Sequence, residues 1–267
     1  MAAAKKKKPV NPFDDHELTY ISPSSVSAYL TDRSYWIAKY IFKIESNAGP
    51  AAWRGTAVEA GLEASFFAPS KSPLAVAYQS FEGEAQGELR DDIEAERRAI
   101  PAMLEQAQKA FSRHPQKPII TQQKHLHDVP GLMVPLMGYS DFTYEDHHMD
   151  LKTTMRCPSK PKPNHAMQVS FYAKASGHDK AYLCYVTPKR NEIYRLDKDE
   201  IEENYNEIVR HAKAIQSMLL TARIASEVLD DRDAKTILAE QNTGDFSSFY
   251  WDDETRQTAL AHIEAWK

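Results

Sequence analysis

The chain has 267 residues, a formal net charge of −5 and 42% hydrophobic residues. This length and composition predict a globular fold built as one elaborated domain, and they exclude a disordered chain. No apolar run approaches the roughly 20 residues of a membrane helix, and two cysteines are too few for a disulfide framework. We therefore expect a cytoplasmic protein without a membrane partner.

The first part of the chain predicts helices that follow a loose tail. Residues 1–18 are expected to form a flexible basic tail, because a run of lysines is followed by prolines. Ser22 is a suitable N-cap for a helix that extends to about Lys43. A second helix is predicted for Ala51–Phe67. A stretch rich in Ala, Glu and Gln from about Glu84 to His114 predicts a third.

Strands are expected in the middle of the chain. The pattern predicts three strands joined by tight turns, at Pro118–Asp128, Leu132–Glu145 and His147–Thr154. Further along, it predicts a helix His165–Gly177, a hairpin of Lys180–Thr187 with Glu192–Leu196, and a long helix from Asp199 to about Arg223. This order predicts an α/β fold in which a central mixed sheet is flanked by helices.

The most informative segment runs from Gly138 to Thr154. Alternate residues of a strand share a face, so Asp150 and Lys152 are expected to point the same way. A hairpin with its turn at Glu145–Asp146 would place Asp141 opposite, or nearly opposite, Asp150. Two carboxylates that close repel each other unless a cation lies between them, and Mg²⁺ or Mn²⁺ prefers oxygen ligands. With Lys152 beside a metal-bound water, this arrangement suits phosphodiester hydrolysis.

Two other interpretations of this segment stay open at the sequence level. An isolated Asp-x-Lys is most often a surface ion pair on an exposed strand. The neighbouring run Glu145–His148 is compatible with a zinc-type cluster, although a polar hairpin tip explains the same residues.

Five segments, in order along the chain, carry a resemblance to a known family. They are Ile21–Tyr29 in the first helix, Arg54–Glu63 in the second helix, Gly138–Asp141, Asp150–Lys152, and the Gln-x-x-x-Tyr helix Gln168–Tyr172. Together they resemble the PD-(D/E)xK nuclease superfamily, and most closely its RecB-like branch of the phage recombination exonuclease type. The resemblance implies a restriction-endonuclease-like core at about residues 20–195 and a helical extension at about 198–267. Both would belong to a single domain, 19–267.

The resemblance implies a catalytic role for the matching polar residues. Asp141, Asp150 and the backbone carbonyl of Leu151 would ligate one or two divalent ions, and Lys152 would position or activate the attacking water. Glu59 stands where the family often has a histidine, and it would ligate an ion directly or through water. A solvated helix residue without a ligand role is the alternative for Glu59.

The resemblance also implies contacts with DNA. Gln168 and Tyr172 would orient the catalytic lysine and contact the strand near the cut, and ordinary packing of the helix on the sheet is their alternative. Residues expected to contact DNA phosphates are Arg33, Arg54, Arg156, Lys160, Lys162 and His165.

The function implied by the resemblance is a Mg²⁺- or Mn²⁺-dependent DNA exonuclease in recombination, repair or phage DNA processing. Its substrate would be linear DNA ends, duplex or single-stranded, in the cytoplasm of a bacterial or phage-infected cell. The type also allows a single-strand annealing protein as a partner, and a homo-oligomer. No iron–sulfur cluster is expected, because the first helix has no cysteine and none follows Cys184. The alternatives are a structure-specific endonuclease and a non-catalytic DNA-binding module on the same fold.

Overall fold

The computed structural model describes residues 11–44, 48–87, 90–228, 233–241, 251 and 253–264. Residues 1–10 of the predicted basic tail lie outside the described residues. Its remaining part, 11–18, is not a loose tail, because it contains a 3₁₀ helix at Asp14–His16 and buries Phe13 and His16. The chain forms two compact units, of which the first comprises Met1–Ser46, Leu126–Met137 and Ile208–Lys267, and the second Asn47–His125 and Gly138–Glu207. The single domain expected for 19–267 stays a prediction. No helix in the described ranges is long and apolar enough to cross a membrane.

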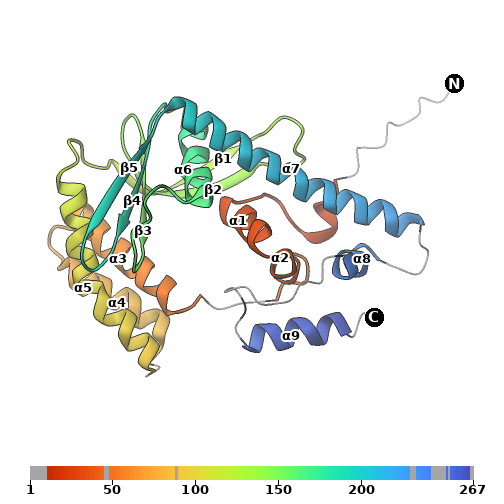
Figure 1. Ribbon diagram of the computed structural model, residues 1–267, viewed down its shortest axis with the longest axis horizontal. Coiled ribbons are helices and arrows are strands. Elements are labelled where there is room, and N and C mark those ends of the chain that lie inside the picture. The colour runs from red at the N-terminus through yellow and green to blue at the C-terminus, as the bar shows by residue number, and fades with distance from the viewer. Residues whose placement is uncertain are drawn as a thin grey trace. The chain divides into compact units, whose positions relative to one another are not determined.

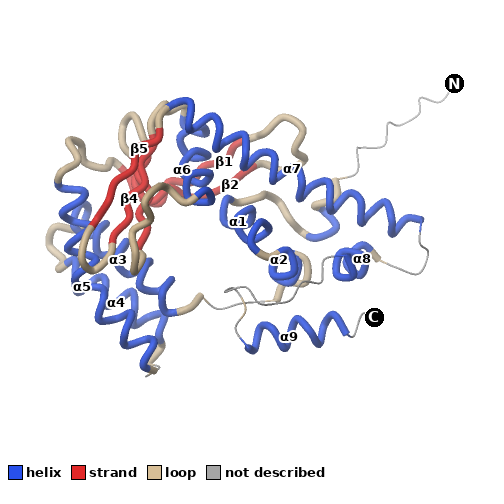
Figure 2. The backbone as a smooth tube through the Cα atoms, viewed as in Figure 1, coloured by secondary structure: helices blue, strands red, loops and turns tan. Residues whose placement is uncertain are grey.

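A five-stranded sheet has the order β1-β2-β3-β4-β5. The strands are β1 (Ile120–His127), β2 (Leu136–Thr143), β3 (His148–Thr153), β4 (Ala181–Val186) and β5 (Asn191–Leu196). β2 pairs antiparallel with β3, β3 parallel with β4, and β4 antiparallel with β5, so the sheet is mixed. Figures 1 and 2 show the sheet and its helices. The predicted α/β fold, with a mixed sheet flanked by helices, is confirmed.

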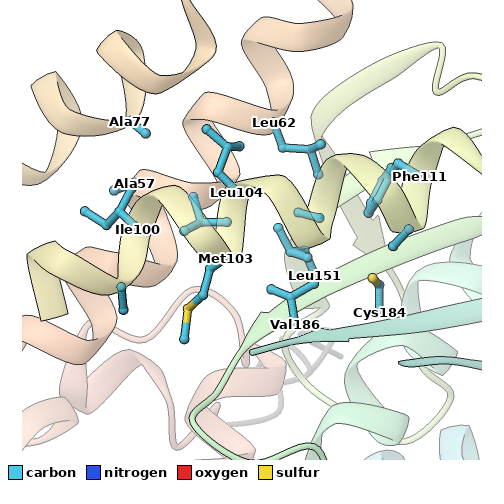
Figure 3. Packing of buried hydrophobic residues seen from close by; sticks show 14 of the residues in the cluster. Ala57, Leu62, Ala77, Ile100, Met103, Leu104, Phe111, Leu151, Cys184 and Val186 are labelled. Atoms are coloured by element: carbon cyan, nitrogen blue, oxygen red, sulfur yellow. The ribbon is translucent and has the colours of Figure 1, made fainter. Parts of the chain in front are cut away.

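One face of the sheet is covered by α3 (Pro50–Phe67) and α5 (Asp91–Ser112), and α4 (Pro73–Ala85) packs on these two helices. Leu62, Leu104 and Phe111 from these helices belong to one buried cluster with Leu151 and Val186 of the sheet (Figure 3). Burial of each such side chain contributes about 1.5–3 kcal/mol. One face of β3 is therefore buried in this core. The opposite face of β3 carries the polar side chains.

The close contact between α3 and α4 depends on a glycine. A Cβ atom at Gly61 would lie 2.8 Å from the Pro73 carbonyl oxygen and 3.0 Å from the Ala77 Cβ. A larger residue would push the two helices apart. This matters for function because α3 carries Glu59, one of the predicted ligands.

The opposite face of the sheet packs against α6 (Pro163–Ser176). Val169 and Ala173 of this helix are buried with Leu183 and Tyr185 of β4. The helix ends where predicted, because Gly177 takes a left-handed conformation with φ +72°.

Several predicted elements differ from the structure. The helix expected from Ser22 to Lys43 is two helices, α1 (Pro23–Thr31) and α2 (Arg33–Tyr40), because Asp32 is extended and caps α2 by accepting the Tyr35 N–H at 3.0 Å. The helix α4 was not predicted, and α5 begins only at Asp91. No tight turn joins β1 to β2, since residues 128–135 form a longer loop.

The first compact unit contains η1 (Asp14–His16), α1, α2, most of α7 (Lys198–Val228), α8 (Ala234–Gln241) and α9 (Asp253–Glu264). Ile21 forms a parallel bridge with Leu136. Arg223 of α7 is paired with Asp15, with nitrogen-to-oxygen distances of 2.5 and 2.6 Å. These contacts connect segments far apart in the sequence within one unit.

Candidate active site

The β2–β3 hairpin brings together the two predicted aspartates. Its register pairs Phe142 with Met149 and Thr143 with His148. Continued by one step, this register puts Asp141 opposite Asp150. The Asp141 carboxylate also accepts a hydrogen bond of 2.8 Å from the backbone N–H of Leu151. The geometry expected from strand alternation is therefore present.

The buried Asp150 is paired with the partly buried Lys152. The Lys152 Nζ lies 2.9 Å from Asp150 Oδ2, and the Asp150 side chain is only 1% exposed. The surface ion pair considered from the sequence is therefore not what the structure contains. In the described part of the chain, Asp150 Oδ1 has no hydrogen-bond partner. A buried carboxylate oxygen without a donor is costly unless a cation binds it.

Lys152 keeps its proton in this environment. Burial lowers the pKa of Lys152, but the negative charges of Asp150 and Asp141 raise it by more, so the net shift is upward. In the metal-free protein the side chain is thus a cation, suited to orient a water or hold a phosphate oxygen. It is not a neutral base in that state.

Three carboxylates influence one another at this site. Burial raises the pKa of Asp141 well above its usual value, and the charges of Asp150 and Glu59 raise it further. Burial also raises the pKa of Glu59, to about 7, with an added contribution from Asp150. Burial raises the pKa of Asp150, although Lys152 opposes this shift. Three acidic groups with raised pKa values indicate that Lys152 alone does not balance their negative charge when all three are ionised.

The donor set fits a divalent cation. Carboxylate oxygens are the ligands that Mg²⁺ and Mn²⁺ prefer, and Asp150 Oδ1 is a buried acceptor in need of one. Asp141, Asp150 and Glu59 would hold the ion, and a ligand role for the Leu151 carbonyl stays a prediction. Within the described ranges no three His, Cys, Asp or Glu side chains form a ready-made metal-binding group. Two of the three carboxylates are engaged with neighbouring side chains instead: Asp150 is paired with Lys152, and Glu59 accepts a hydrogen bond from Gln122.

Sequence reasoning missed Gln122. Its side-chain amide donates a hydrogen bond to Glu59 Oε1. Among the described strand residues Gln122 alone has a positive φ, +50°, a conformation that costs roughly 1–2 kcal/mol for a residue with a side chain. Strained residues of this kind cluster at functional sites. A glutamine inside a strand gives no sequence signal of such a role.

Gln168 and Tyr172 lie together on α6, as their spacing predicts. Gln168 Nε2 donates to the Tyr172 hydroxyl at 2.9 Å. Burial raises the pKa of Tyr172, and the charge of Asp150 raises it further, so the tyrosine is neutral. Its ring lies against His125, with centroids 5.3 Å apart. The hydroxyl that accepts from Gln168 keeps its own hydrogen, which it can donate.

A closed ring of five hydrogen bonds lies next to this tyrosine. It runs through His125, Ser140, Thr143, His148, Ser176 and back to His125, with distances between 2.9 and 3.3 Å. Three hydroxyls and two neutral imidazoles supply five hydrogens for these five bonds. A protonated histidine would supply one hydrogen too many. The ring connects β1, β2, β3 and α6, which carry most of the site.

The structure does not favour the zinc alternative at Glu145–His148. His147 Nδ1 bonds Asp146 at 2.7 Å, and Asp146 also accepts from Lys180. Both nitrogens of His148 are used in the hydrogen-bonded ring. His147 Nε2 is buried without a partner among the described residues, but no three His, Cys, Asp or Glu side chains converge there.

The residues predicted to contact DNA differ in how exposed their side chains are and in whether they are already paired. Arg156, Lys160 and Lys162 are exposed on the loop between β3 and α6. Arg54 is 4% exposed and is paired with Glu96. The exposed Arg33 belongs to the first compact unit, where its guanidinium lies 5.1 Å from the Tyr29 ring centre. The DNA-contact roles of these residues, and of the partly buried His165, stay predictions.

A sequence profile of the PD-(D/E)XK nuclease superfamily matches residues 20–261. The chain belongs to this superfamily. PD-(D/E)XK nucleases generally use divalent ions such as Mg²⁺ or Mn²⁺, in agreement with the donor set described above.

Solved structures and curated sequences give further comparisons. A crystal structure of a candidate exonuclease from Eubacterium rectale has 13% identity and a TM-score of 0.49, over 80% of this chain and 88% of that one. The crystal structure of SSO0001 has 20% identity and a TM-score of 0.29, over 58% of this chain and 73% of the other. No curated protein matches the chain significantly.

Proposed function

We propose that this nuclease is a divalent-metal-dependent DNA exonuclease of the RecB-like branch. The observation that carries the proposal is the pairing of Asp141 with Asp150 beside the partly buried Lys152, with Asp150 Oδ1 lacking a partner among the described residues. When bound by Asp141, Asp150, Glu59 and the Leu151 carbonyl, Mg²⁺ or Mn²⁺ would lower the pKa of a water and screen charge on the phosphate.

The side chains around the carboxylates then have distinct roles in the proposed reaction. The protonated Lys152 orients the attacking water and stabilises negative charge that develops on the phosphate. Tyr172, held by Gln168, keeps the lysine in position and contacts the DNA strand near the cut. Arg156, Lys160 and Lys162, with the other predicted cations, hold neighbouring phosphates.

The exonuclease assignment is supported by the Gln168–Tyr172 helix, which resembles that of the RecB-like branch. In this proposal the enzyme degrades linear DNA, duplex or single-stranded, during recombination, repair or phage DNA processing. It acts in the cytoplasm of a bacterial or phage-infected cell, alone or with an annealing protein, as a monomer or a homo-oligomer.

The test is digestion of end-labelled linear duplex and covalently closed circular DNA with Mg²⁺ or Mn²⁺. The wild type is compared with Asp150→Ala and Lys152→Ala, and EDTA is the metal-free control. We expect loss of linear DNA only, abolished by EDTA and by both substitutions. Cleavage of closed circles would instead identify an endonuclease. Tight DNA binding with no cleavage of any substrate would identify a binding module.

A further inference from the structure

The buried hydroxyl of Tyr185 connects the loop after β3 to the first turn of α6. Tyr185 lies on β4, fully buried, and is the register partner of Lys152 across the parallel β3–β4 pair. Its hydroxyl oxygen accepts the backbone N–H of Lys162 at 3.1 Å. The same oxygen lies 2.9 Å from His165 Nδ1.

The hydrogen bonds of the Tyr185 hydroxyl favour one tautomer of His165. The Lys162 N–H can only donate, so the Tyr185 oxygen is its acceptor. The single hydroxyl hydrogen of Tyr185 then has His165 Nδ1 as its acceptor. If Nδ1 carried a hydrogen, the buried tyrosine hydroxyl would lose that acceptor, which costs about 1–3 kcal/mol. His165 therefore carries its hydrogen on Nε2.

The surroundings of His165 keep it neutral. Burial lowers its pKa to about 3, and the positive charges of Lys152 and Lys162 contribute to the same shift. Its ring also lies over the Tyr185 ring, at a plane angle of 29° and a centroid distance of 5.6 Å. Tyr185 thus holds the imidazole both by ring stacking and through Nδ1. Because no described residue bonds Nε2, the Nε2–H group is available to a ligand.

We propose that Tyr185 is a positioning residue that fixes His165 as the Nε2–H tautomer, and that His165 donates this hydrogen to a non-bridging phosphate oxygen of the DNA bound at Lys152. This inference rests on the proposed function, since it names the substrate group that His165 contacts. A neutral donor held by the register partner of Lys152 adds a hydrogen bond to the phosphate without adding charge repulsion to the lysine.

The tautomer is tested by imidazole ¹⁵N NMR on the full-length protein, which does not depend on activity. We expect the wild type to show the Nε2–H form, and Tyr185→Phe to give a mixture of tautomers. Tyr194→Phe is the matched control, because the Tyr194 hydroxyl donates to the Pro158 carbonyl and not to His165. A wild-type spectrum with the hydrogen on Nδ1, or a Tyr185→Phe spectrum unchanged from wild type, overturns the proposal.

The contact with phosphate is tested by comparing two amides at position 165. Glutamine places its N–H group near the position of Nε2, whereas asparagine places it near Nδ1. We expect His165→Asn to lower kcat/KM by about 10- to 100-fold, the loss expected for a hydrogen bond to a charged group, and His165→Gln to retain most of it. Equal losses in the two variants overturn the contact. If the wild type cleaves no DNA, the proposed function fails, while the NMR result still decides the tautomer.

Discussion

The charge of Lys152 is the residue-scale feature on which the proposed chemistry depends. Lys152→Met keeps the length of the side chain but removes the cation beside Asp150, so charge on the phosphate is no longer stabilised. We expect kcat to fall by about 10²- to 10³-fold, the loss typical of removing one group that stabilises transition-state charge. The measurement is single-turnover cleavage of linear duplex DNA at saturating Mn²⁺. Lys124→Met, at an exposed lysine of β1, is the control. Wild-type rates in Lys152→Met would remove Lys152 from the mechanism.

Glu59 makes the stability of the metal-free protein depend on pH. Its pKa is raised from 4.5 to about 7 on folding, so between these values the folded state binds more protons than the unfolded state. The free energy of unfolding therefore falls as the pH rises through this window, by about 1–3 kcal/mol for this group. Glu59→Gln keeps a hydrogen-bond acceptor for Gln122 but removes the ionisation.

We therefore expect Glu59→Gln to stabilise the EDTA-treated protein at pH 8 and to have little effect at pH 4.5. Urea unfolding at the two pH values measures this difference. Added Mn²⁺ should stabilise the wild type more than the variant, because an ion that binds only the folded state adds to its stability. An equal effect of Mn²⁺ on both proteins would argue against Glu59 as a ligand.

At the scale of elements, local sequence patterns predicted the part of the site that one hairpin builds. Alternation along β2 and β3 was enough to place Asp141 opposite Asp150, because a strand has a period of two and the turn fixes the register. The contact between Glu59 and Gln122 joins residues 63 positions apart and depends on a backbone conformation that is rare for glutamine. No local pattern encodes either feature.

Helix boundaries failed for a related reason. Asp32 is a polar residue inside an otherwise periodic stretch, and only its extended backbone shows that it ends α1 and caps α2. The helix α4 likewise depends on its close packing against α3 at Gly61, and the sequence of α4 alone does not indicate that contact. Propensity is a weak guide where packing decides.

The hydrogen-bonded ring makes a prediction for the sheet. Thr143→Val conserves the shape of the side chain but removes the hydroxyl that bonds both Ser140 and His148. Because both partners stay buried without a replacement, we expect a loss of about 1–3 kcal/mol in the free energy of unfolding. Chemical denaturation measures it, with the exposed Thr56→Val in α3 as the control. Equal stability of the two variants would mean that the ring contributes nothing to the fold.

At the scale of the whole molecule, the net charge argues against DNA binding, whereas the local charge near the site favours it. A chain with a net charge of −5 is not expected to attract DNA as a body. Binding must then depend on a restricted set of cations near the site. The exposed loop with Arg156, Lys160 and Lys162 follows Lys152 closely in the chain, and for these residues no carboxylate partner is found among the described residues.

The dependence of DNA affinity on salt tests this division of charge. In an Asp150→Asn background, which prevents cleavage, replacement of all three loop cations by alanine removes up to three phosphate contacts. The slope of log K against log salt should then become shallower by about 2–3, since each contact releases about 0.9 of a counterion from duplex DNA. Fluorescence anisotropy between low and moderate salt measures the slope.

The control changes the net charge equally but away from the loop. Arg97, Lys109 and Lys174 are exposed cations, each already paired with a carboxylate. Their replacement by alanine removes the same three charges, so a bulk effect of net charge would weaken binding as much as the loop variant does. If instead the loop supplies the phosphate contacts, the control keeps the wild-type slope and only the loop variant loses it. A common slope for both triple variants would show that the acidic body as a whole, and not the loop after β3, sets the affinity for DNA.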